Sequence, residues 1–250
     1  MNRLIRAEIV KLSTVCTYWL LAAGTLVLVA GGIAPIAAGT SFSPGTSPAR
    51  AALALAGLAQ TVALITGALA VTSEYRHKTI TPAVLITPRR ARLLAAKLAT
   101  MTAAGLVLGL VTTGLAAAIA LPVLSGRHLP TGISGLQLAA IIAGGGAATA
   151  ICAALGAGAG AVIRNQVGAV ITVLALVYVA EPVLGLLPGA GTAVQEYGIG
   201  GLATAATATS GFPVTAHLLG QGPAIAVLAG YALAALAAGT LLLNQRDIIA

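Results

Sequence analysis

The stretch AGGGAATAICAALGAGAGA, residues 143–161, decides the fold class, because it carries no charged side chain and is almost entirely small or apolar. It lies within a longer run without Lys, Arg, Asp or Glu, residues 128–163. A helix needs roughly 20 apolar residues to cross a hydrocarbon core about 30 Å thick. A strand of a membrane barrel would instead alternate polar and apolar side chains over about ten residues. The stretch therefore predicts a membrane-spanning helix.

The composition extends this prediction to the whole chain. Hydrophobic residues make up 58% of the 250 residues, only five side chains are acidic, and the mean hydropathy is +1.02. So few polar groups cannot cover the surface of a water-soluble protein of this size. We expect an all-α integral membrane protein, a single domain of residues 1–250 with six transmembrane helices. The spans are expected near residues 17–38, 51–73, 98–122, 136–162, 166–188 and 223–243.

The basic residues predict the orientation of the chain. With six spans both termini lie on one side, and the segments on that side hold eleven of the thirteen Lys and Arg residues. These are Arg3, Arg6, Lys11, Arg76, Lys78, Arg89, Arg90, Arg92, Lys97, Arg164 and Arg246. Only Arg50 and Arg127 lie on the other side. Cytoplasmic segments are enriched in Lys and Arg, so we expect both termini in the cytoplasm of a multi-pass plasma-membrane protein.

The segment before the first span, MNRLIRAEIVKLST, residues 1–14, mixes charged and apolar residues. On a helix its apolar side chains, Leu4, Ile5, Ile9 and Leu12, share one broad stripe. Two readings remain open. The segment is either an interfacial amphipathic helix with its Lys and Arg near anionic headgroups, or a charged flank that fixes topology.

The segment TSEYRHKTITPAVLITPRRARLLAAK, residues 72–97, concentrates six of the thirteen basic residues between the second and third spans. Pro88 precedes RRARLLAAK and is well placed to start a helix, with Thr87 as its cap. Lys97 is expected to extend its ammonium group back to the membrane surface. The apolar residues 83–86 predict either a dip into the lipid interface or a contact with a partner protein. A loop that only fixed topology would not need this internal order.

Three motifs together resemble the permease subunits of bacterial ATP-binding cassette exporters of the type 2 class, especially the small six-span permeases of high-GC Gram-positive bacteria. They are RAEIVKL before the first span, SEYRHKTI at the end of the second and TPRRARLLAAKL before the third. The resemblance implies that the N-terminal helix is a connecting helix with Arg3, Arg6, Glu8 and Lys11. It also implies that residues 74–97 form a coupling segment that docks on an ATPase. Its pattern positions are Glu74, Tyr75, Arg76, Thr79, Pro88, Arg89, Arg90 and Lys97.

The resemblance also predicts the partners. A phosphate-binding P-loop requires Gly directly before its Lys, but the three lysines follow Val10, His77 and Ala96. We therefore expect that this chain is not an enzyme and binds no cofactor, and that ATP and Mg²⁺ bind a separate ATPase subunit. A second permease copy or a paralogue would complete the pathway. Membrane lipids are expected as partners and nucleic acid is not. Lipids, peptides and hydrophobic antibiotics all suit so apolar a pathway.

Other functions have to be weighed against the same residues. No catalytic residue is expected. A metal site is not expected either, because His77, His128 and His217 fall in three separate segments without ligand spacing. An ion-coupled secondary transporter would need an ionisable group inside the membrane, and Glu181 in VYVAEPVLG is the one candidate. Glu181 is read as an ion site, as a wall of an outward exit, or as a residue at the outer water boundary. A non-transporting membrane scaffold or immunity protein is a third class.

The long segment between the fifth and sixth spans, residues 189–222, is rich in Gly, Ala and Thr. It is expected on the extracellular side. The resemblance implies re-entrant or interfacial helices here, whereas the composition alone equally allows a flexible loop. The glycines of the fourth span predict close helix packing, because lipid supplies no hydrophobic force between helices and small residues let the backbones approach.

Overall fold

The computed structural model of the chain describes residues 2–39, 47–77, 90–129, 131–209 and 218–245. The described residues contain helices and no strand, which confirms the all-α prediction. The longer helices are α1 (Asn2–Thr14), α2 (Cys16–Gly39), α4 (Leu58–Arg76), α6 (Arg90–Gly126), α7 (Gly135–Ile163), α8 (Gln166–Ala175) and α12 (Gln221–Gln245). The shorter ones are α3 (Pro48–Leu53), η1 (Ala54–Gly57), η2 (Leu176–Ala180), α9 (Glu181–Gly185), α10 (Gly191–Tyr197) and α11 (Ile199–Thr207).

Six of the described helical segments are long and apolar enough to cross a membrane, which confirms the predicted multi-pass character. Two of them are composite: α3, η1 and α4 run on as one span, and α8, η2 and α9 as another. The segments are Cys16–Ala38, Pro48–Arg76, Leu94–Gly126, Gly135–Ile163, Gln166–Gly185 and Gln221–Leu242. Each overlaps one expected span, and most begin or end a few residues away from the expected bound.

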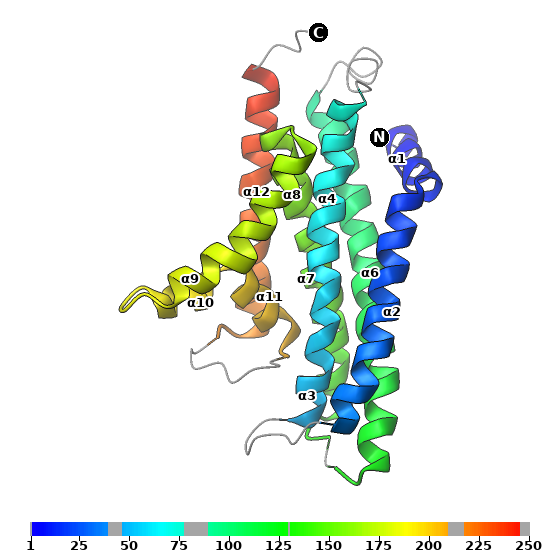
Figure 1. Cartoon of the computed structure of the whole chain (residues 1–250). Coiled ribbons are helices and arrows are strands. Elements are labelled where there is room, and N and C mark those ends of the chain that lie inside the picture. Colours follow the sequence, from blue (N-terminus) through cyan, green and yellow to red (C-terminus); the bar gives the residue numbers. More distant parts are fainter. Residues whose placement is uncertain (1, 40–46, 78–89, 130, 210–217, 246–250) are drawn as a thin grey trace.

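The helices form an upright bundle with two distinguishable ends (Figure 1). Helix α1 lies at one end, together with the C-terminal part of α12, and α3 lies at the other. These are called the α1 end and the α3 end below. Both ends of the expected coupling segment, residues 74–97, are helical. Helix α4 continues to Arg76, and α6 begins at Arg90.

Helix α7 forms the centre of the bundle, and its glycines face its neighbours. A Cβ added to Gly156 would lie 2.0 Å from the carbonyl oxygen of Leu64 in α4, and one added to Gly145 would lie 2.2 Å from the hydroxyl of Thr113 in α6. Such backbone approach is possible only without a side chain. The small residues of the fourth span thus pack α4 and α6 against α7 within one chain.

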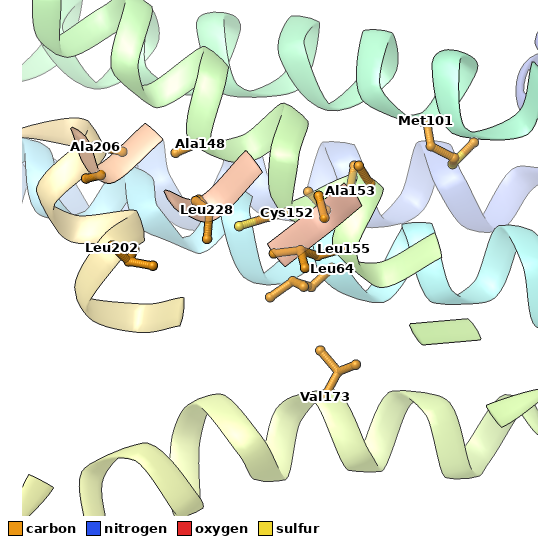
Figure 2. Packing of buried hydrophobic residues seen from close by; sticks show 14 of the residues in the cluster. Leu64, Met101, Ala148, Cys152, Ala153, Leu155, Val173, Leu202, Ala206 and Leu228 are labelled. Atoms are coloured by element: carbon orange, nitrogen blue, oxygen red, sulfur yellow. The ribbon is translucent and has the colours of Figure 1, made fainter. Parts of the chain in front are cut away.

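The largest apolar core surrounds the middle of α7. Figure 2 shows Ala148, Cys152, Ala153 and Leu155 of α7 among side chains from neighbouring helices. Those neighbours include Leu64 of α4, Met101 of α6, Leu202 and Ala206 of α11, and Leu228 of α12. Helix α11, from the segment after the fifth span, therefore contributes to the same core as the spans.

The fifth span departs from regular α-helix at η2, which is a π-helical turn. Pro182 follows it and has no N–H to donate to the carbonyl four residues earlier. The wider turn absorbs this break, with the N–H of Glu181 bonded to the carbonyl of Leu176. None of the residues in η2 and α9 is buried, and this part of the span leans away from the bundle (Figure 1).

Helices α10 and α11 occupy residues 191–207 of the segment that was expected to be extracellular. Residues 191–197 and 199–207 are therefore helical and not a loop, whereas residues 189–190, 208–209 and 218–220 are turns or irregular. Residues 210–217 lie outside the described part of the chain. The membrane side of the segment stays a prediction.

Candidate functional site

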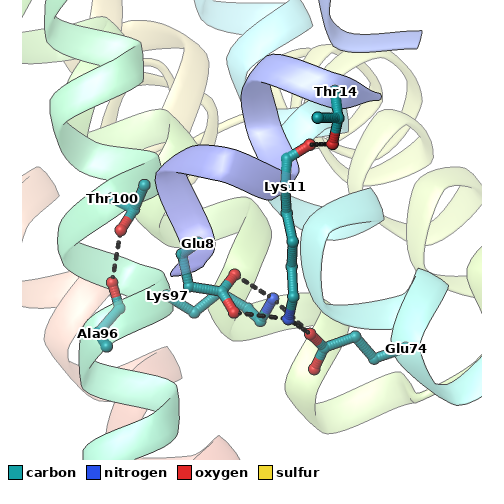
Figure 3. Close-up of polar contacts among 7 residues, drawn as sticks. All are labelled: Glu8, Lys11, Thr14, Glu74, Ala96, Lys97 and Thr100. Atoms are coloured by element: carbon teal, nitrogen blue, oxygen red, sulfur yellow. Dashed lines mark hydrogen bonds and ion pairs between the residues drawn. The ribbon is translucent and has the colours of Figure 1, made fainter. Parts of the chain in front are cut away.

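Four charged side chains from three helices meet near the α1 end of the bundle (Figure 3). Lys97 of α6 donates to Glu8 of α1 at 2.7 Å and to Glu74 of α4 at 2.9 Å. Lys11 of α1 donates to the same two carboxylates, at 2.8 Å each. Two ammonium groups and two carboxylates cancel, so this ion cluster carries no net charge.

Burial separates the roles of the four residues. The side chains of Glu8 and Lys97 are 5% exposed and that of Glu74 is 10% exposed, whereas Lys11 is 51% exposed. Lys97 is thus the buried centre of the ion cluster and Lys11 closes it toward solvent. A buried charge without its partner is costly, which makes the ion cluster a specific joint between α1, α4 and α6.

The ion cluster also shifts the pKa of its α1 members. Burial pushes the pKa of Glu8 upward, but the ammonium groups of Lys97 and Lys11 outweigh it and hold that pKa below its usual value. Burial pushes the pKa of Lys11 downward, but hydrogen bonds to Glu74 and Glu8 outweigh it and raise that pKa. Both shifts favour the charged form.

One expectation from the sequence needs correction here. Lys97 does not extend back to the membrane surface, since its ammonium group is buried between two carboxylates. On α1, Glu8 is buried, and Leu4, Ile5 and Leu12 of the apolar stripe are partly buried on the same face, three or four residues from it. Ile9, the fourth residue of the stripe, is 52% exposed. Whether α1 lies at a membrane interface stays a prediction.

The other expected coupling residues lie around this end of α4. Arg76 is exposed and donates to the side-chain oxygen of Gln166 at 3.1 Å. The guanidinium of Arg164 lies over the ring of Tyr75, 5.4 Å from its centroid, and donates to the carbonyl of Leu242 in α12. These contacts join the ends of α4, α7, α8 and α12.

Several expected residues cannot be placed beside them. Thr79, Pro88 and Arg89 lie outside the described residues. Arg90 opens α6 and Arg3 belongs to α1, but their side chains are also outside the description. Arg6 is exposed on α1. The structure therefore brings together Glu8, Lys11, Glu74 and Lys97 of the expected set.

A cavity of about 760 Å³ lies between the second span, the fifth span and α11. Its wall is mainly apolar and includes Cys152 of α7. Its polar lining comes from the amide of Gln60 and from the hydroxyl groups of Thr61, Tyr178, Thr204, Thr207 and Thr209. The hydroxyls of Thr61 and Tyr178 are hydrogen-bonded to each other across it. This size and lining suit an uncharged, largely apolar molecule.

Glu181 lies beside this cavity and uses both of its carboxylate oxygens on α11. One accepts the backbone N–H of Ile199 at 2.6 Å and the other that of Gly200 at 2.8 Å. A carboxylate at a helix N-terminus satisfies amides that have no partner within the helix. The contact favours a structural role for Glu181 over an ion-coupling role.

Sequence reasoning missed three groups of this region. Arg164 was used only as a charge that indicates topology, but its guanidinium donates to the carbonyl of Leu242 in α12. Gln221 at the start of α12 was not considered, and it donates to the carbonyls of Ala140 and Ala206 at 2.7 and 2.9 Å. Thr61 with Tyr178 was missed as well. Each is a polar side chain in or beside an apolar span, which is the signal that would have found them.

The two basic residues expected on the far side lie near the α3 end. Arg127, just past α6, donates to the carbonyl of Ala37 at 2.6 Å, in the last turn of α2. Arg50 belongs to α3. The contact of Arg127 gives a structural reason for a basic residue at this end.

Comparisons with protein-family models and with curated proteins give no match for this chain.

Proposed function

We propose that this chain is the membrane-spanning permease subunit of an ATP-driven exporter that works with a separate ATPase subunit. The observation that carries the proposal is the ion cluster. It ties α1 to α4 and α6 at the point where these two helices flank residues 77–89 of the basic segment. The resemblance described above supplies the class of partner and the direction of transport.

The ion cluster gives a mechanical basis for coupling. A displacement of the segment between α4 and α6 reaches Glu74 and Lys97 directly, because both lie on those helices within a few turns of it. Both residues bond Glu8, either directly or through Lys11, so α1 has to follow. An ATPase that docks on the basic segment would therefore move three helices as one joint.

The charge distribution supports a cytoplasmic α1 end. Of the described basic residues, Arg6, Lys11, Arg76, Lys97 and Arg164 belong to helix ends near α1. Arg50 and Arg127 are near the α3 end. This is the asymmetry expected of a protein with both termini in the cytoplasm. The α3 end and helices α10 and α11 would then face outward.

The cavity between the second and fifth spans is the proposed cargo site. A volume of about 760 Å³ lies in the range of small-molecule sites, and the wall offers hydroxyl groups but no ammonium or guanidinium group. An uncharged, apolar cargo with one or two hydrogen-bonding groups fits this lining. A second permease copy would cover the fifth span, because only 11% of the residues in its most apolar stretch are buried in one chain.

The test is co-purification with the ATPase encoded beside this chain. The tagged permease is co-expressed with it, solubilised in mild detergent, and assayed for bound ATPase and for ATP hydrolysis. We expect a stable complex that the double reversal Arg89→Glu and Arg90→Glu disrupts at least tenfold. The matched control is Arg50→Glu with Arg127→Glu, which makes the same charge change at the opposite end.

The possible results distinguish docking on the basic segment from the proposed function itself. Retention of the ATPase by the control, at a level similar to the unmodified chain, together with its loss from the 89/90 variant, supports docking on the basic segment. Equal retention by both variants would contradict docking there. A permease that purifies alone, with no adjacent ATPase gene, would contradict the proposed function itself. Size-exclusion chromatography of each variant shows that it is folded.

A further inference from the structure

Helix α11 forms one wall of the cavity, and its two ends are held by different parts of the molecule. At its C-terminal end the side chain of Gln221 donates to the carbonyl of Ala206, and also to that of Ala140 in α7. At its N-terminal end the carboxylate of Glu181 accepts the amides of Ile199 and Gly200. Helix α11 thus bridges the central bundle and the outer half of the fifth span.

The two attachments differ in rigidity. Gln221 and Ala206 belong to a region where Leu202, Ala205, Ala206 and Leu228 are buried in the main core. Glu181 belongs to the part of the fifth span in which no residue of η2 or α9 is buried. Segments with few buried contacts open at the lowest free energy. Motion between the two parts therefore concentrates at the Glu181 end.

The local sequence is built for this contact. Glycines at 198 and 200 face the carboxylate, and a Cβ at Gly198 would lie 2.9 Å from the Cδ of Glu181. A Cβ at Gly200 would lie 3.1 Å from Oε2 of the same side chain. Absence of side chains lets the carboxylate reach both amides at once. A carboxylate near a helix N-terminus also gains from the helix dipole.

From these contacts we propose that Glu181 is a positioning residue that latches α11 against the fifth span and so holds these two walls of the cavity together. Residues next to the latch line the cavity on both sides: Val177, Tyr178 and Pro182 from the fifth span, and Ile199 and Gly200 from α11. Separation of Glu181 from the amides parts these two walls. The inference rests on the proposed function for the claim that the cavity holds cargo, and release of the latch would open its exit.

Cys152 provides a native reporter of this opening, because it lines the cavity and is 1% exposed. The other cysteine, Cys16, is exposed and is replaced by Ser. Labelling of Cys152 by N-ethylmaleimide is then followed in membranes that contain the full chain. We expect slow labelling with Glu181 in place and a rate about 10- to 100-fold higher in Glu181→Ala, which loses two charge-assisted hydrogen bonds. Glu181→Gln keeps one acceptor oxygen and should label at an intermediate rate.

Two controls distinguish the latch from general loosening. Glu196→Gln removes one negative charge from α10, in the same segment, and should leave the rate unchanged. A second reporter, Ala117→Cys in a Cys152→Ala background, is 4% exposed in a different core cluster and does not line the cavity. Its labelling should not respond to Glu181→Ala. A parallel rise at this position would show global loosening and overturn the proposal.

Gly200→Ala is the second variant, and it decides the question if Glu181→Ala does not fold. It keeps the carboxylate but places a methyl group 3.1 Å from Oε2, so labelling should rise several-fold. Unchanged labelling of Cys152 in folded Glu181→Ala, or in Gly200→Ala where the former does not fold, would refute the latch. Labelling needs no ATPase, so failure here is distinguishable from failure of the coupling proposal.

Discussion

Replacement of Lys97 by Met is the sharpest test of the ion cluster. Met keeps the length of the side chain and removes the ammonium group that donates to Glu8 and Glu74 at 2.7 and 2.9 Å. Breaking a buried pair by removing one partner typically costs about 3–5 kcal/mol. Lys11 still contacts both carboxylates, so we expect the lower part of this range, about 3 kcal/mol.

The assay is denaturant unfolding in detergent, followed by the fluorescence of Trp19 and by helical circular dichroism. Trp19 is the sole tryptophan and donates to the carbonyl of Ser13 in α1 at 3.1 Å, so it reports on loss of α1. The control is Arg6→Met, which removes a positive charge from an exposed position of α1. It should change the free energy of unfolding by less than about 0.5 kcal/mol.

A double-mutant cycle isolates the electrostatic part. Lys97→Met leaves one ammonium group for two carboxylates, and adding Glu8→Gln restores neutrality. The double variant should therefore lose at least about 1 kcal/mol less than the sum of the two single losses. Additive losses, or a Lys97→Met variant as stable as Arg6→Met, would refute the reasoning.

Three further outcomes follow from the structure. Gly156→Ala should destabilise the chain by more than about 2 kcal/mol, since its Cβ would lie 2.0 Å from a backbone carbonyl oxygen. In the control Gly114→Ala the added Cβ meets nothing within 4 Å, so this variant should be as stable as the unmodified chain or more stable. The midpoints of denaturant unfolding compare the two variants. The lowered pKa of Glu8 gives a contribution to stability that is present above its ordinary pKa and is lost as the pH falls through the lower native value. The raised pKa of Lys11 gives one that is present below its ordinary pKa and is lost as the pH rises through the higher native value. A thermal midpoint measured against pH should fall on both sides of a plateau from about pH 5 to 10, and Glu8→Gln should weaken the acid-side fall. Arg127→Ala should cost about 1 kcal/mol through the lost bond to Ala37, and equal stability of Arg127→Ala and the unmodified chain would show that this bond contributes nothing.

The sequence predicts the helical class and six spans because both depend on local composition. A long uncharged run such as residues 143–161 has no alternative in a membrane, where each backbone polar group needs a partner within its own helix. Close packing at α7 was also predictable, since glycine density is a local property. Which helices those glycines face was not, because that depends on the positions of α4 and α6.

The roles of Glu181 and of residues 189–209 could be predicted only in part. Spacing identifies Glu181 as an ionisable group in the fifth span, but the carboxylate finds its partners 18 and 19 residues later, at the start of α11. Composition could not distinguish helices from a loop there. The helical contacts of α11 with the main core, and not its own apolar content, explain why it is ordered as a cavity wall.

The orientation of α1 depends on charge as well as on hydrophobic spacing. Leu4, Ile5 and Leu12 are three or four residues from Glu8, so they share its face of the helix and are partly buried with it. Beside a membrane, lipid accepts an apolar side chain as well as protein does, so an apolar stripe alone does not show which side faces the bundle. Glu8 is different, because a buried carboxylate needs ammonium groups as partners. Lys97 on α6 provides one at 2.7 Å, so Glu8 faces inward, and Ile9 remains 52% exposed. For helices at a membrane surface, the charged residues with partners on other helices therefore identify the inner face.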